Sequence, residues 1–156
     1  MLKHGLRIVV AAAAAALILS AAPAFAAPPQ PVDQKFDVPA GAACTFPVEL
    51  VVTGKTKTID LPGGSTIITA PGQDATITNQ DSGRSVRLNI TGAFHVTTEP
   101  NGDVVTVASG RNVLLDPIAG FVLTEGNFTF AFDAGGNLIA PLSGTGRVTD
   151  ICALIA

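Results

Sequence analysis

Apolar and polar residues alternate in short runs along much of the chain. Residues 86–90 and 94–96 alternate between the two kinds of side chain, and Phe128, Phe130 and Phe132 form a further alternating stripe. Successive side chains of a β-strand point to opposite faces, so a period of two places one set on a core face. We therefore predict strands at these positions, with the three Phe rings pointing inward.

Clusters rich in Gly, Pro, Asn and Asp separate the alternating runs at intervals of roughly 8 to 12 residues. They lie at 53–55, 62–64, 71–74, 81–84, 100–103, 109–112, 125–127 and 134–137. After residue 26, no stretch has a helical apolar period that is free of Gly and Pro, so we expect little helix. The pattern predicts an all-β fold, a single antiparallel β-sandwich of about 9–11 short strands, with a flattened β-barrel as the alternative.

Residues 1–26 have the order of a bacterial secretory signal peptide. A basic start with Lys3 and Arg7 precedes an apolar run at 8–19, and small residues end in Ala24-Phe25-Ala26. That order is typical of a cleaved leader, and the run is shorter than the roughly 20 residues of a membrane span. We predict cleavage after Ala26, secretion, and no membrane span in the mature chain. A retained anchor is the alternative.

The two ends of the mature chain differ in character. Residues 27–43 are rich in Pro and Ala and are predicted to form an extended linker, with Phe36 and Val38 docking as a short edge segment. The β-sandwich domain is then expected at 44–156. Residues 146–156 are apolar enough for a terminal strand inside a sheet. In that strand Asp150 would share a face with Cys152, a conflict that a bulge, a strand edge or a hydrogen-bonded acid would resolve.

The chain has two cysteines, Cys44 and Cys152. In an exported protein two cysteines most simply form a disulfide, with free thiols or an intermolecular bridge as alternatives. A bond that closes a loop of about 100 residues gains about 4.7 kcal/mol in the chain-entropy account. We predict that it joins the first and last strands of the domain.

Charge and aromatic content narrow the range of partners. Loss of Lys3 and Arg7 with the leader leaves 7 of the 9 basic residues against 12 acidic ones, a net charge of −5. Nucleic acid is therefore not an expected partner, because its binding needs a basic surface. The chain has no Trp and no Tyr, so stacking platforms for sugars or single strands are not expected. No cofactor is expected either.

His95 is the one histidine left after removal of the leader. A Ser-His-Asp arrangement would have to combine it with Ser85 or Ser109 and with Asp103 or Asp116. The sequence has no Gly-x-Ser-x-Gly elbow, and alternation places His95 on the solvent side of its strand. We therefore expect no catalytic role for it. One His and two bridged Cys also do not supply a zinc ligand set.

The acidic residues offer further candidates. Glu49, Glu99 and Glu125 are the candidates for a carboxylate pair in glycoside hydrolysis, but nothing in the sequence places two of them together. The oxygen-rich stretches 101–103 and 133–137 match no calcium loop, so turn hydrogen bonding is expected there. Residues 62–65 lack the strand-loop-helix context of a phosphate loop, so a turn is expected there too.

Three stretches, 55–64, 110–117 and 128–138, together with Cys152 resemble small exported proteins of high-GC actinobacteria, a group for which no activity is assigned. The resemblance covers residues 36–156. It implies export and a single β-domain, and it brings no catalytic residue.

The expected function is that of a secreted, non-enzymatic β-domain with an envelope-associated or extracellular binding role. One alternative is a small secreted hydrolase that uses His95 or a carboxylate pair. Another is a carrier of a small apolar ligand, which would need a roomy interior beside the Phe stripe.

Overall fold

The structure, a computed structural model, describes residues 27–156, and the predicted signal peptide lies outside them. Within these residues, nine strands and one helix follow in chain order: β1 (Gln30–Val38), β2 (Val48–Leu61), β3 (Ser65–Thr69), β4 (Asp74–Asn79), β5 (Ser85–Asn89), β6 (Ala93–Thr98), β7 (Val104–Asp116), β8 (Gly120–Phe132), β9 (Leu138–Asp150) and α1 (Ile151–Ile155). The predicted all-β fold is confirmed. None of the described helical residues forms a helix long and apolar enough to cross a membrane.

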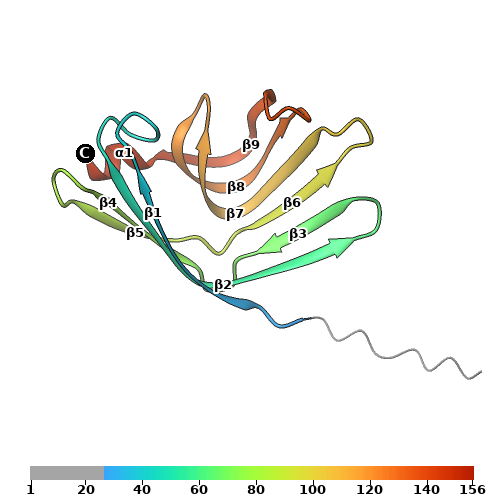
Figure 1. Cartoon of the computed structure of the whole chain (residues 1–156), viewed down its shortest axis with the longest axis horizontal. Coiled ribbons are helices and arrows are strands. Elements are labelled where there is room, and N and C mark those ends of the chain that lie inside the picture. The colour runs from blue at the N-terminus through green and yellow to red at the C-terminus, as the bar shows by residue number, and fades with distance from the viewer. Residues whose placement is uncertain (1–26) are drawn as a thin grey trace, which may run out of the picture.

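The strands form one open antiparallel sheet in the order β5-β4-β2-β3-β6-β7-β8-β9, with β1 paired to β2. β2 pairs with two strands in series, because residues 48–53 bond to β4 and residues 57–61 bond to β3. The sheet therefore divides into two arms, and β2 runs from the first into the second (Figure 1). The first arm contains β1, β4, β5 and residues 48–53. The second arm contains residues 57–61, β3, β6 and residues 104–109, 126–132 and 138–145.

β7, β8 and β9 continue beyond the second arm. Their remaining parts, residues 111–116, 120–125 and 147–150, rise between the two arms as a middle layer (Figure 1). Because this layer has a neighbour on each side, the four consecutive β8 residues 121–124 are all buried. The fold is thus sandwich-like. Since β5 and β9 remain at the ends of an open sheet, the alternative of a closed, flattened barrel is wrong.

A row of glycines marks the bend between the second arm and the middle layer. Gly110, Gly126 and Gly146 are register partners across three strands. Gly126 has a φ of +148°, and a Cβ placed on it would lie 2.8 Å from the Gly146 Cα, so no other residue fits without moving the backbone. The clusters at 53–55, 109–112 and 125–127 were expected to separate strands, and this is wrong, because their glycines lie inside continuous strands.

The main core lies between the first arm and the middle layer. It contains nine buried residues: Cys44, Val48, Ala75, Ile77, Leu88, Phe121, Leu123, Ile151 and Ile155. The Phe stripe lies on the other side of the middle layer. Phe128 is buried there, and the half-buried rings of Phe130 and Phe132 meet edge to face with centroids 6.0 Å apart.

At both ends of the described chain the secondary structure differs from the prediction. Gln30–Val38 forms β1, paired along residues 48–56. Phe36 and Val38 dock in an edge strand as expected, but the strand also includes residues 30–35 of the predicted linker. An edge strand accepts Pro31 because its outward side needs no donor. At the other end, β9 stops at Asp150 and the next five residues form α1, so the predicted terminal strand through residue 156 is wrong.

Candidate functional site

The last residues of the chain close one end of the main core. The Asp150 carboxylate accepts a hydrogen bond from the Ala153 N–H at 3.3 Å and so caps the start of α1. Ile151 and Ile155 lie four residues apart, on one side of the helix, and both are fully buried. The acid that conflicted with an apolar strand face is therefore a hydrogen-bonded helix cap.

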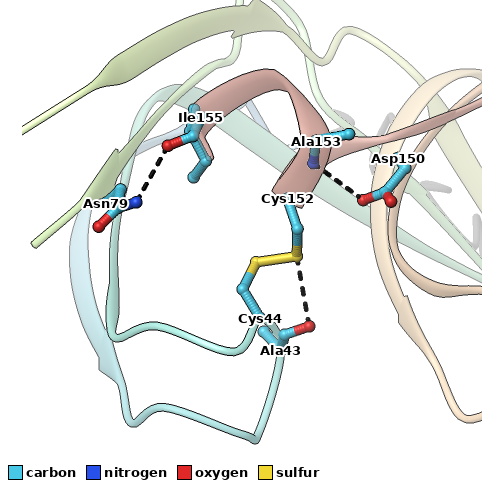
Figure 2. Close-up of a disulfide and its surroundings, with 7 residues drawn as sticks. All are labelled: Ala43, Cys44, Asn79, Asp150, Cys152, Ala153 and Ile155. Carbon is cyan, nitrogen blue, oxygen red and sulfur yellow. Dashed lines mark hydrogen bonds between the residues drawn. A yellow bond between two sulfur atoms is a disulfide. The ribbon is translucent and has the colours of Figure 1, made fainter. Parts of the chain in front are cut away.

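Donors from the first arm hold the other end of α1. Asn79 Nδ2 donates to the Ile155 carbonyl oxygen at 3.0 Å (Figure 2), and the Arg84 guanidinium donates to a carbonyl oxygen of Ala156. These bonds satisfy carbonyls that a helix end leaves without partners. Asn79 Oδ1 also accepts from the Asp81 N–H at 2.9 Å, so one buried amide connects the β4–β5 turn to the C-terminus.

Cys44, in the connection between β1 and β2, is joined to Cys152 of α1 (Figure 2). Their Cα atoms are 5.6 Å apart across a sequence separation of 108 residues. Cys152 Sγ lies 3.4 Å from the Ala43 carbonyl oxygen. This is a packing contact, because a bridged sulfur has no proton to donate. The two cysteines pair as expected, but the bond fastens a loop to a helix and not the first strand to the last.

An open cleft of about 330 Å³ lies beside the disulfide. Three separate segments line it: residues 41–45, residues 119–121, and Asp150 with Cys152. Most of the lining residues are Gly, Ala or half-cystine, and Phe121 is the one aromatic residue among them. The volume falls at the lower end of the range for small-molecule sites, about 300–1,000 Å³.

The turn between β7 and β8 builds one wall of the cleft. Asp116 Oδ1 accepts from the N–H groups of Ile118 at 2.8 Å and Ala119 at 2.6 Å. Pro117 sets the φ angle that the turn needs, and Gly120 follows with a φ of +80°. The sequence carries this Asp-Pro-x-x-Gly turn signal, although the turn was not among those predicted. Asp116 is engaged in it and is not part of a catalytic triad.

Among the described residues, Asp150 is the only ionisable side chain that lines the cleft, and it remains exposed. Within the described chain only its Oδ1 carries a hydrogen bond, so Oδ2 can accept one from a ligand. Thr45 adds a hydroxyl. Hydrolysis needs an activated nucleophile or two carboxylates, whereas the cleft offers one carboxylate and bridged sulfurs. The arrangement is suited to binding.

Comparison of the chain with protein-family models, with curated proteins and with solved structures finds no match. No relative therefore supplies a ligand or a set of catalytic residues. The chemistry of the cleft rests on the residues that line it.

His95 lies in the second arm, far along the sheet from the disulfide. It is exposed in the middle of β6, as alternation predicted, and its register partners are Ile67 and Val107. None of the four partners considered for a triad is one of these neighbours: Ser85 lies in β5, Ser109 and Asp116 in β7, and Asp103 before β7. The geometry does not assemble the Ser-His-Asp candidate.

The three candidate glutamates lie apart. Glu49 forms an ion pair with Lys35 on the first arm, and this bond raises the pKa of the Lys35 ammonium. Glu125 lies at the bend of β8 and pairs with Arg111 at 2.9 Å. Glu99 lies in the connection between β6 and β7. No two of them form the carboxylate pair that glycoside hydrolysis requires.

The oxygen-rich stretches form turns, as the sequence indicated. The Asp133 carboxylate accepts from the N–H groups of Gly135 at 2.9 Å and Asn137 at 2.8 Å and from the Asn137 side chain. In the other stretch, the Asn101 side chain donates to the Asp103 carboxylate at 2.8 Å and accepts from the Asp103 N–H at 3.1 Å. Residues 62–64 connect β2 and β3. Among residues 27–156, no three His, Cys, Asp or Glu side chains are grouped to hold a metal.

A small cavity of about 60 Å³ lies next to the Phe stripe, between Leu114, Leu115 and Asp116 of the middle layer and Phe130 and Phe132 of the second arm. Ligand sites measure about 300–1,000 Å³. This space is too small for the apolar cargo that a carrier function would need.

Proposed function

We propose that the protein is an exported, non-enzymatic binding domain, and that its ligand is a small molecule or peptide side chain with a cationic group. The cleft beside the disulfide is the observation that carries this proposal. It combines a volume of about 330 Å³ with a single carboxylate among small and apolar lining residues.

The lining favours a ligand with a charged end and an apolar body. An ammonium or guanidinium group can donate a charge-assisted hydrogen bond to Asp150. The methylene stem of a Lys or Arg side chain can pack along Phe121 and the disulfide, because such stems bury readily while the charge stays in water. Thr45 and the backbone of residues 41–45 supply further polar groups.

The walls of the cleft are held before any ligand arrives. The disulfide fixes the loop at 41–45, the cap fixes Asp150, and the Asp116 hydrogen bonds fix residues 119–121. A preorganised site loses less conformational entropy on binding. This rigidity supports a binding role that needs no induced closure.

Export is part of the proposal. A disulfide persists in oxidising compartments, and the chain begins with the pattern of a signal peptide. Both features favour a protein that works outside the cytoplasm.

Isothermal titration calorimetry with N-acetyl-arginine amide and N-acetyl-norleucine amide tests the cleft. We expect the cationic probe to bind about tenfold more tightly, since a hydrogen bond to a charged group contributes about 1.5–3 kcal/mol and exposure at the rim reduces it. The Asp150→Asn variant removes the charge and keeps the helix cap, because Asn caps as well as Asp. It should bind the two probes equally. Equal binding of both probes by the unmodified protein would refute the proposal, as would an undiminished preference in Asp150→Asn.

A further inference from the structure

The second arm has a broad face that no other strand or helix of residues 27–156 covers. The outer face is the side of this arm on which Lys57, Ile59 and Leu61 of β2 lie. It also includes the residues paired with these three, strand by strand, across β3, β6, β7, β8 and β9. It contains three rows of six positions, eighteen in all. The central row consists of Ile59, Ile67, His95, Val107, Thr129 and Ser143. The opposite face carries the Phe stripe and meets the middle layer.

The outer face is nearly free of charge. Lys57, in a corner position, is its only charged residue besides the ionisable His95, and it has no acidic residue. The remaining positions are apolar or carry neutral hydroxyl and amide groups. Ile59 and Val107, both in the central row, are the large apolar side chains of this face that are exposed, each at 37%.

The same side of the sheet is very different on the first arm. There, three rows of four positions include six charged residues: Asp33, Lys35, Asp37, Glu49, Asp74 and Arg87. Two ion pairs form among them, Lys35 with Glu49 and Arg87 with Asp74. The first arm therefore presents a solvated surface, and the absence of charge is particular to the second arm.

We propose that two copies of the chain pair through this outer face. A partner without charged residues fits best, because a basic one would find no counter-charge on this face and an acidic one would find only Lys57 and His95. The central row of a second copy contains no Asp, Glu, Lys or Arg. Two such faces can stack at about 10 Å, as in β-sandwiches, in the twofold arrangement that most homodimers adopt. The interface is independent of the cleft, which lies at the disulfide end.

The size of the face sets the expected strength. Eighteen positions per copy lie just below the roughly 20–30 residues that each partner contributes to a standard interface. Specific interfaces at this low end are weak and transient, so we expect a reversible, concentration-dependent dimer.

Sedimentation velocity of the mature chain, from about 10 µM to 1 mM, tests the pairing. The average mass should rise toward that of a dimer, while Val107→Lys and Thr129→Lys, both at exposed central positions, should remain monomeric. Ser85→Lys places the same charge on the outer side of the first arm and should dimerise as the unmodified chain does. Far-ultraviolet circular dichroism confirms that each variant is folded.

Two results would overturn the proposal. A chain that stays monomeric over the whole range does not pair through any face, and the outer face would then belong to a different partner. A dimer that persists in both central-row variants would use another surface.

Discussion

Replacing Ile155 by alanine tests whether the short C-terminal helix is part of the core. Ile155 is fully buried among residues of the first arm and the middle layer. The change removes three carbon atoms, worth about 0.8 kcal/mol each, and leaves a cavity, so the free energy of unfolding should fall by about 3 kcal/mol within the usual range of 2–5. Leu154 is the matched control, because it is next in the helix but 42% exposed. Leu154→Ala should cost less than about 1 kcal/mol.

Urea unfolding followed by far-ultraviolet circular dichroism is the suitable assay, since a chain with no Trp and no Tyr gives little intrinsic fluorescence. With an m value on the order of 1.5 kcal/mol per molar urea, Ile155→Ala should lower the midpoint by about 2 M. The docking of α1 would be refuted by equal midpoints for the Ile155 and Leu154 variants. An m value unchanged from the unmodified chain is also expected, because the folded state remains compact.

Two further predictions concern the bend and an exposed turn. Gly126→Ala should lower the thermal midpoint more than Gly63→Ala, because both glycines have positive φ but only the first lacks room for a Cβ; similar losses would show that the bend tolerates a side chain. The pKa of Asp133 is held below its usual value, chiefly by the hydrogen bond from the Asn137 side chain. Its ionised form therefore stabilises the fold above the unfolded-state pKa of about 3.9, and this contribution is lost as pH falls through the lower folded-state pKa. The loss in melting temperature caused by Asp133→Ala should thus be small, and it should be greater at pH 7 than at a pH below the folded-state pKa. A loss of equal size at both pH values would contradict the assignment.

Local sequence patterns predicted much of the fold. Alternation at 86–90 and at the Phe stripe correctly predicted strands, and alternation around His95 correctly predicted that this side chain faces solvent. These features depend on side-chain period alone, so a single stretch of sequence contains the whole signal.

The bends could not be predicted in that way. Gly126 has the same local context in a bend as in a hairpin turn, and only the approach of the β9 backbone distinguishes the two. The terminal helix is five residues long, too short for a helical period to stand out from a strand. The sequence signal for this helix was Asp150 at the N-cap position, followed by Ile151 and Ile155, two apolar residues four positions apart.

The cleft was beyond sequence reasoning for a different reason. Its three segments, 41–45, 119–121 and 150–152, are far apart in the chain, and most of their side chains are small and chemically inert. Asp150 stood out from the sequence as a misplaced acid, yet its neighbours across the cleft are set by the disulfide and by the β7–β8 turn. The site therefore exists only in the folded chain, and no local sequence motif marks it.

Amide chemical-shift mapping is the most direct test of the binding role. When N-acetyl-arginine amide is added to the ¹⁵N-labelled mature protein, the largest shifts should fall on residues 41–45, 119–121 and 150–152, and they should shrink strongly in Asp150→Asn. Shifts that centre on another part of the chain, or a spectrum unchanged at saturating probe, would contradict a cation-binding cleft beside the disulfide.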